Sequence, residues 1–83
     1  MAATYILFSE KLDKYYIGST RDPMEIRLKK HLSDHEGFTA KAKDWKVVFL
    51  ENFDSYEKAG LKEKIIKGWK SRKMIEKLIL SSN

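Results

Sequence analysis

An arginine and a histidine stand four residues apart in the first stretch with helical periodicity. At 100° per residue, Arg27 and His31 lie together along one edge of an apolar stripe. An arginine and a histidine therefore project from one side of one helix, near the boundary of the core. The commoner explanation is structural, because an arginine stem often covers apolar surface beside a half-buried histidine. The stripe consists of Met24, Leu28 and Leu32.

Glu63 is a second candidate, because its carboxylate borders the buried side of a later helix. It lies four residues after Ala59 and three before Ile66, so the three residues share one side of the helix. The commoner explanation is again structural: a solvated carboxylate that pairs with one of the lysines nearby. Those lysines are Lys58, Lys62, Lys64 and Lys67.

The lack of cysteine limits the metal chemistry open to the chain. Neither a disulfide framework nor a thiolate zinc site can form, so any metal must be held by oxygen or by His31 and His35. Oxygen ligands favour a hard ion such as Mg²⁺.

Tyrosines are the third group of candidates, with Tyr5 on the first strand of a predicted hairpin and Tyr16 on the second. Alternation puts Tyr16 and its neighbour Tyr15 on opposite faces of their strand, so at most one of them reaches a given side of the sheet. Tyrosines in a small sheet ordinarily serve packing. Gly18 lets a backbone or a phosphate come close, although a glycine that merely ends a strand is equally ordinary.

Composition predicts one domain over residues 1–83, because a chain of 83 residues with 42% hydrophobic residues can bury one modest core. No run approaches the length of a membrane span, and the first residues lack a signal-peptide pattern, so we expect a cytoplasmic protein without a membrane partner. The formal charge of +5 favours polyanionic partners through phosphate neutralisation. Charge alone is weak evidence, since many small basic domains bind nucleic acid only incidentally.

Hydrophobic periodicity predicts a small α/β (α+β) domain in which helices pack on a three-stranded sheet, in the order ββαβαα. β-Branched and aromatic residues mark the strands, and apolar residues spaced by three and four mark the helices. The predicted elements are a hairpin of strands 4–9 and 15–19, a helix over 23–32, a strand over 45–53, and helices over 56–67 and 71–80.

Capping signals predict where these helices begin and end. Asp22 suits the N-cap of the first helix, with Pro23 at its first position and Glu25 completing a capping box. The Asp-Ser pair at 54–55 supplies the N-cap of the second helix, and Gly68 marks its end.

The remaining segments are predicted from their apolar residues or from the lack of a period. Residues 33–44 read as a loop whose Lys41 and Lys43 could face a ligand. The apolar residues of the second helix are Ala59, Leu61, Ile65 and Ile66. The last helix places on one face Met74, Ile75, Leu78 and Ile79.

Together these residues follow the pattern of a known family. Ala3-Thr4-Tyr5 is followed after ten residues by Tyr16-Ile17-Gly18, then by an arginine on one helix and a glutamate on a later one. This order resembles the GIY-YIG nuclease family, found in excision-repair and homing endonucleases and in many short stand-alone bacterial proteins. The likeness covers almost the whole chain and is closest to the stand-alone group, although Ser19 stands where some members carry a lysine. The stretches that carry it are 15–20, 27–31, 38–41 and 63–73.

The resemblance implies a role for each candidate residue. Tyr5 and Tyr16 would be the two active-site tyrosines, Arg27 would bind phosphate, and His31 would be an auxiliary site residue. Glu63 would be the single ligand of a divalent ion, Mg²⁺ or Mn²⁺. A tyrosine with its ordinary pKa of about 10 is a poor base for the attacking water. Nearby cations must therefore lower its pKa, or it must relay the proton to a metal-bound water. Which tyrosine takes the proton stays open, with a slight preference for Tyr16 and with Tyr5 as its partner.

The implied activity is structure-selective cleavage of DNA in repair or processing, with little base specificity, because phosphate contacts position a protein without reading sequence. Two other functions stay open. A nucleic-acid-binding module without cleavage predicts binding that is insensitive to Glu63→Ala, and a protein-interaction domain predicts no salt-dependent affinity for nucleic acid. DNA versus RNA and the oligomeric state are left undecided. The cations expected to contact nucleic acid are Arg21, Lys30, Lys41 and Lys43.

Overall fold

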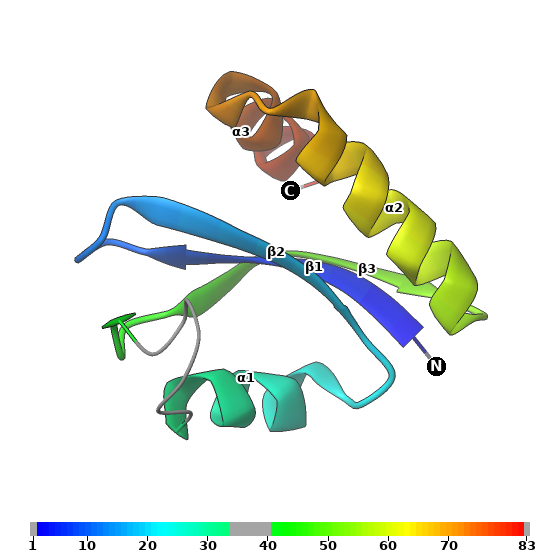
Figure 1. Ribbon diagram of the computed structural model, residues 1–83, viewed down its shortest axis with the longest axis horizontal. Helices are drawn as coiled ribbons and strands as arrows, with labels where there is room; N and C mark the ends of the chain where they lie inside the picture. The colour runs from blue at the N-terminus through cyan, green and yellow to red at the C-terminus, as the bar shows by residue number, and fades with distance from the viewer. Residues whose placement is uncertain (1, 34–40, 83) are drawn as a thin grey trace.

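The computed structural model of the protein describes residues 2–33 and 41–82. Over these residues the chain forms an α+β fold in the predicted order ββαβαα. The three strands make one sheet, with helices on both of its faces (Figure 1). The elements are β1 (Ala2–Ser9), β2 (Lys14–Thr20), α1 (Met24–Ser33), β3 (Lys46–Phe53), α2 (Tyr56–Trp69) and α3 (Arg72–Ser81).

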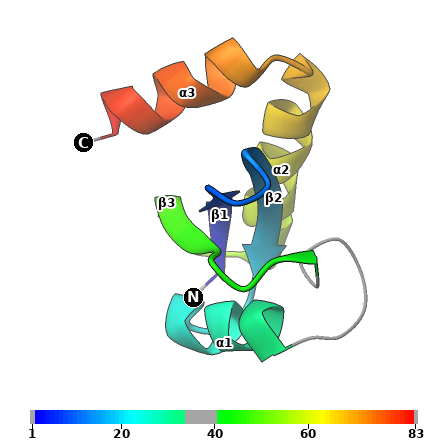
Figure 2. The ribbon, with the colours of Figure 1, turned by 90° about the vertical axis from the view of Figure 1, so that its left-hand side faces the viewer.

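The central strand of the sheet is β1, which pairs antiparallel with β2 on one side and with β3 on the other. Because α1 covers one face and α2 and α3 cover the opposite face, β1 is buried on both faces and reads as a nearly continuous apolar run (Figure 1). Viewed from the side, α2 lies next to β2, and α3 turns away from it across the same face (Figure 2). The edge strand β2 is therefore the strand against which α2 packs most closely.

Two clusters of apolar side chains flank the sheet, because alternate residues of β1 point to opposite faces. On the α1 face, Tyr5 and Leu7 pack with Trp45 and with the predicted stripe of α1, which is thereby confirmed. On the other face the buried residues are Ile6, Phe49, Ile66 and Ile75.

The ends of two helices differ from their predictions. The first begins at Met24, and the Pro23 carbonyl accepts from the Arg27 amide at 3.1 Å. The Asp22 carboxylate pairs with Lys30 at 3.2 Å. The prediction that Gly68 ends the second helix is wrong: α2 continues to Trp69, and Lys70 takes the left-handed cap conformation with φ 49°. The predicted cap at 54–55 is confirmed, since the Ser55 side chain accepts from the Lys58 amide.

Fewer apolar residues of α2 face the core than its composition suggested. Ala59 and Ile66 are buried, but Leu61 and Ile65 are 61% and 55% exposed. In α3 Ile75 is buried, whereas Met74 is 45% exposed. Packing selects one narrow stripe of each helix, which composition alone does not locate. No helix within residues 2–33 and 41–82 combines the length and the apolar character needed to cross a membrane.

Candidate active site

The hydroxyl of Tyr5 is the meeting point of the first two candidates. Tyr5 lies on β1 and is fully buried. Its Oη forms a 2.8 Å hydrogen bond with His31 Nε2, and Arg27 Nε donates to the same oxygen at 3.2 Å. His31 is 6% exposed, and Arg27 is half-buried. The edge of α1 that carries both residues is thus turned toward the sheet rather than toward solvent.

Tyr16 joins this group from the neighbouring strand. Its ring centre lies 5.0 Å from that of His31, edge-on, and 6.4 Å from that of Tyr5. Tyr15 points to the opposite face, where its hydroxyl donates to Glu76 at 3.2 Å. The predicted separation of Tyr15 and Tyr16 is confirmed, and it places Tyr16, which is half-buried, on the side of Arg27 and His31.

Gly18 is required by the close approach of Tyr5. The two residues are directly paired across β1 and β2. A Cβ atom at position 18 would lie 2.5 Å from Tyr5 Oη and 2.6 Å from Tyr5 Cζ. Of the two explanations left open by the sequence, close approach is the one observed, and the approaching group is a side chain of the same protein.

The surroundings of Tyr5 keep its phenol protonated. Burial raises the pKa of Tyr5 above its ordinary value, and the hydrogen bond and charge of Arg27 lower it by less. The nearby Tyr16 and the Glu63 carboxylate add further upward shifts of this pKa. Tyr5 is therefore a neutral hydrogen-bonding group at neutral pH.

Glu63 approaches the end of β2 from the opposite side of the sheet. Ser19 Oγ donates to Glu63 Oε1 at 2.6 Å, and the Lys67 ammonium pairs with Oε2. The Glu63 side chain is 22% exposed, which confirms its predicted place at the border of the buried side. Ser19 was not predicted as a partner of Glu63, although alternation along β2 places it on the same face as Tyr15. Lys67 was predicted only as one of several lysines near Glu63.

A depression of about 290 Å³ lies between these two groups at the end of β2. The predicted cation Arg21 stands there, with its guanidinium 4.4 Å from the centre of the Tyr56 ring. Lys30 is near but paired with Asp22. The lining residues are Ser19, Thr20, Arg21, Asp22, Arg27 and Tyr56.

The other two predicted cations lie elsewhere. Lys43 Nζ donates to the Leu32 carbonyl at 2.8 Å, at the C-terminal end of α1. Lys41 is exposed, and neither lysine lines the depression. His35 and most of the stretch 38–41 fall outside the described residues.

The sequence profile of the GIY-YIG catalytic domain matches residues 1–77. The chain belongs to the GIY-YIG family. It therefore carries a nuclease domain, and its fold agrees with that family. No curated protein and no solved structure matched the chain.

The donor atoms of this GIY-YIG domain suit a hydrated hard ion. Among the described residues, no three His, Asp or Glu side chains gather into a metal-binding group. Mg²⁺ commonly keeps several waters and binds through one or two carboxylates, so Glu63 with its partly exposed oxygens fits such an ion. Lys67 occupies Oε2 and would have to give way.

Gly18→Ala tests the close approach of Tyr5. The added methyl group forces the buried Tyr5 ring to move, so we expect the free energy of unfolding to fall by about 1–3 kcal/mol, measured by chemical denaturation. Gly60→Ala is the control: nothing lies within 4 Å of its Cβ position, and alanine in a helix should stabilise by about 0.5–1 kcal/mol. Equal effects of both substitutions would contradict the packing account.

Tyr5→Phe tests the protonation of the buried phenol. It leaves Arg27 and His31 without their shared partner, so we expect a loss of about 1–3 kcal/mol at neutral pH. Because the folded-state pKa of Tyr5 lies above the ordinary 10.0, the unfolded state loses the proton first as pH rises. The Tyr5 hydroxyl therefore contributes fully to the free energy of unfolding below the ordinary pKa of 10.0. This contribution is lost as pH rises through the folded-state pKa. Chemical denaturation at several pH values should show that the difference in free energy of unfolding between wild type and variant shrinks above about pH 10. A difference that does not change with pH would contradict a raised pKa of Tyr5.

Proposed function

We propose that this GIY-YIG domain is a divalent-metal-dependent endonuclease that hydrolyses phosphodiester bonds in DNA, selects its substrate by structure, and serves repair or processing in the cytoplasm. One observation carries the proposal. The group of Tyr5, Tyr16, Arg27 and His31 lies on the α1 side of β2, and Ser19 holds the Glu63 carboxylate at the end of the same strand, on the opposite side of the sheet. Phosphodiester hydrolysis needs positive charge on the transition-state oxygens, an aligned water and an acceptor for its proton, and these residue types can provide them.

Arg27 is the proposed phosphate-binding residue. Tyr5 holds its Nε, so the guanidinium is oriented before substrate arrives and its terminal nitrogens are the ones that can contact a non-bridging oxygen. Arg27 also lines the depression at the end of β2, where a phosphate has access. Tyr5 is then a positioning residue, consistent with its complete burial.

Tyr16 is the proposed group that receives the proton of the attacking water, either as a phenolate or while releasing its own hydroxyl proton to a second water. It is half-buried rather than enclosed, and its ring rests edge-on against His31 at 5.0 Å. Burial makes the Tyr5 phenol harder to ionise, which leaves Tyr16 as the better placed of the two tyrosines. His31 supports both rings and is the proposed auxiliary residue.

Glu63 would hold the metal, Mg²⁺ or Mn²⁺. When bound, such an ion stabilises the charge that develops on the leaving oxygen. Ser19 keeps the carboxylate at the end of β2 through its 2.6 Å hydrogen bond.

A second function, a non-catalytic nucleic-acid-binding module, is favoured by one observation. The Lys67 ammonium is paired with Glu63, and a carboxylate held permanently in this pair would bind no metal. This alternative predicts salt-dependent binding to DNA that does not depend on Glu63.

Glu63→Gln separates the two functions. It preserves size and the hydrogen bond from Ser19 but removes the charge, so we expect metal-dependent cleavage of flap or branched DNA to fall about a hundredfold or more. Binding measured in EDTA should stay within about twofold. The control is Glu57→Gln, an exposed residue of the same helix, which should cleave as wild type does. Wild-type binding without cleavage would select the binding module.

Lys67→Met tests whether this lysine competes with the metal. Removing an ion pair of this kind is worth about 0.3–1 kcal/mol, so the Mg²⁺ concentration for half-maximal cleavage should fall about two- to fivefold. The titration is made at saturating substrate, with Lys64→Met on the same helix as the matched loss of charge. A rise in the required Mg²⁺ concentration would show that Lys67 assists the metal site.

A further inference from the structure

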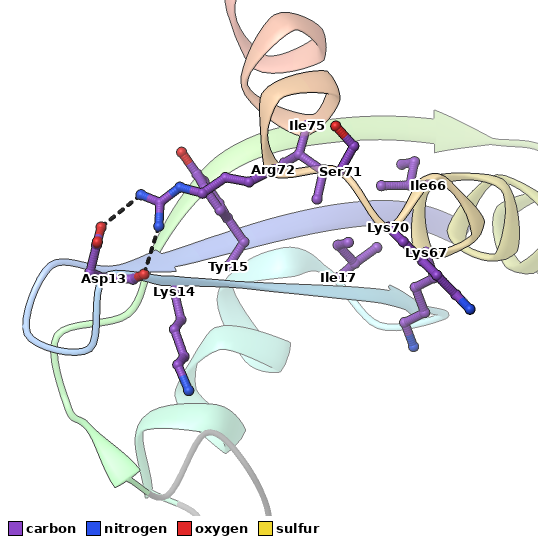
Figure 3. Close-up of a pocket in the computed structure, with 10 residues that line it drawn as sticks. All are labelled: Asp13, Lys14, Tyr15, Ile17, Ile66, Lys67, Lys70, Ser71, Arg72 and Ile75. Carbon is purple, nitrogen blue, oxygen red and sulfur yellow. Dashed lines mark hydrogen bonds and ion pairs between the residues drawn. The ribbon is translucent and has the colours of Figure 1, made fainter.

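A second depression, of about 360 Å³, lies on the α2 and α3 side of β2, beyond the proposed catalytic residues (Figure 3). Its volume is within the range of about 300–1,000 Å³ typical of small-molecule sites. The apolar part of its lining comes from Ile17 on the edge strand, Ile66 on α2, Ile75 on α3 and the ring of Tyr15. An aliphatic and aromatic surface of this kind suits a flat apolar group.

One end of this depression is cationic. Lys67 and Lys70 extend from the last turn of α2 at that end, whereas Lys14 points away from the other lining side chains (Figure 3). Among the described residues, no carboxylate lies within ion-pair distance of the Lys70 ammonium. An apolar surface bordered by cations is complementary to a ligand that alternates flat rings with negative charges.

A row of residues on α2 joins the depression to the proposed catalytic site. Glu63 and Lys67 are four residues apart and lie on one side of the helix, and Lys70 is the C-cap that follows its last residue. Lys67 belongs to both places, since it pairs with Glu63 and lines the depression. The helix rises roughly 10 Å from Glu63 to Lys70, the length of about three stacked nucleotides.

Residues with an unusual backbone conformation also line this depression. Within the described residues, the non-glycine residues with positive φ are Asp13, at 52°, and Lys70, at 49°, and both line this depression. Aspartate tolerates the left-handed region, but a lysine there is strained relative to glycine, the usual residue at such a helix end. A cation therefore occupies a position where glycine would make the fold more stable.

The opposite end of the depression is held rigid by Arg72. Its guanidinium donates to the Asp13 carbonyl at 2.9 Å and to Asp13 Oδ1 at 2.7 Å (Figure 3). Its Nε donates to Glu76 at 3.2 Å. Glu76 also accepts from the Tyr15 hydroxyl. These contacts connect the β1–β2 turn to α3 at this end of the depression.

We propose that this depression is a nucleobase subsite. An unpaired base of a single-stranded segment lies against Ile17 and Tyr15, above the buried Ile66, and the flanking phosphates contact Lys67 and Lys70. Where the scissile phosphate lies relative to this base rests on the proposed function. A base stacked inside a duplex cannot enter such a site without being extruded, so the subsite selects single-stranded and branched nucleic acid.

Lys70→Gly is the first test, because it removes the cation while relieving the left-handed lysine. Binding of a fluorescein-labelled single-stranded DNA of about 15 nucleotides, measured by anisotropy in EDTA, should weaken about three- to tenfold. The slope of log Kd against log salt should fall by about 0.7, the loss of one phosphate contact. Thermal unfolding should show a Tm equal to or above that of wild type.

Lys46→Ala is the control for the loss of one positive charge, because Lys46 is an exposed lysine on the far edge strand. It should change the affinity and the salt slope less than Lys70→Gly does. Equal effects of the two variants would overturn the subsite.

An abasic scan of the substrate is the second test, and it needs no change to the protein. Single abasic sites are moved along the same oligonucleotide, which keeps every phosphate but removes one base at a time. Affinity should fall about tenfold when the missing base is the one that enters the depression, and this loss should disappear in a variant that blocks the subsite, Ile17→Glu. Uniform affinity along the scan would overturn the proposal even if wild type cleaves DNA. A base-dependent scan with no cleavage would support the subsite and reject the nuclease instead.

Discussion

The arrangement of the α1 side depends on one buried hydroxyl. Tyr5 sits in the central strand with no exposed surface, and a buried phenol is costly unless it is hydrogen-bonded. Both of its partners, Arg27 and His31, come from α1, so satisfying this group also fixes how α1 lies under the sheet. The ring can reach them only because residue 18 has no Cβ. The packing of Tyr5 in the core therefore also decides where the proposed phosphate-binding arginine lies.

The edge strand β2 is where the two faces of the molecule cooperate. Alternation sends Tyr16 and Gly18 toward α1, and sends Tyr15, Ile17 and Ser19 toward α2 and α3. A central strand would be covered by neighbours on both sides, but an edge strand leaves room for groups from both faces to meet around it. The proposed tyrosines, Arg27 and His31 lie on the α1 side of β2, and the proposed nucleobase subsite lies on its α2 and α3 side, where Lys67 connects it to Glu63.

The net charge of +5 is a poor guide to where nucleic acid would bind. Several lysines are committed to local ion pairs on the surface, such as Lys30 with Asp22 and Lys58 with Asp54, and pairs of this kind contribute little to stability. Of the four cations expected to contact nucleic acid, Arg21 is the one found lining the depression beside Arg27. Position relative to β2 separates the cations of the proposed site from the other surface cations, and composition carries no such information.

The sequence by itself determined the order of the elements, the opposite faces of Tyr15 and Tyr16, and the shared edge of Arg27 and His31, because periods of 2 and 3.6 residues are local properties of the chain. It also indicated the family, through the order and spacing of its motifs rather than through any period. Tertiary structure alone decided what those residues touch. The bond between Tyr5 and His31 spans 26 positions and that between Ser19 and Glu63 spans 44, distances over which no local period operates. The same limit explains the error at Gly68: the end of α2 was set by how the chain turns into α3, which places Lys70, not a glycine, in the left-handed conformation.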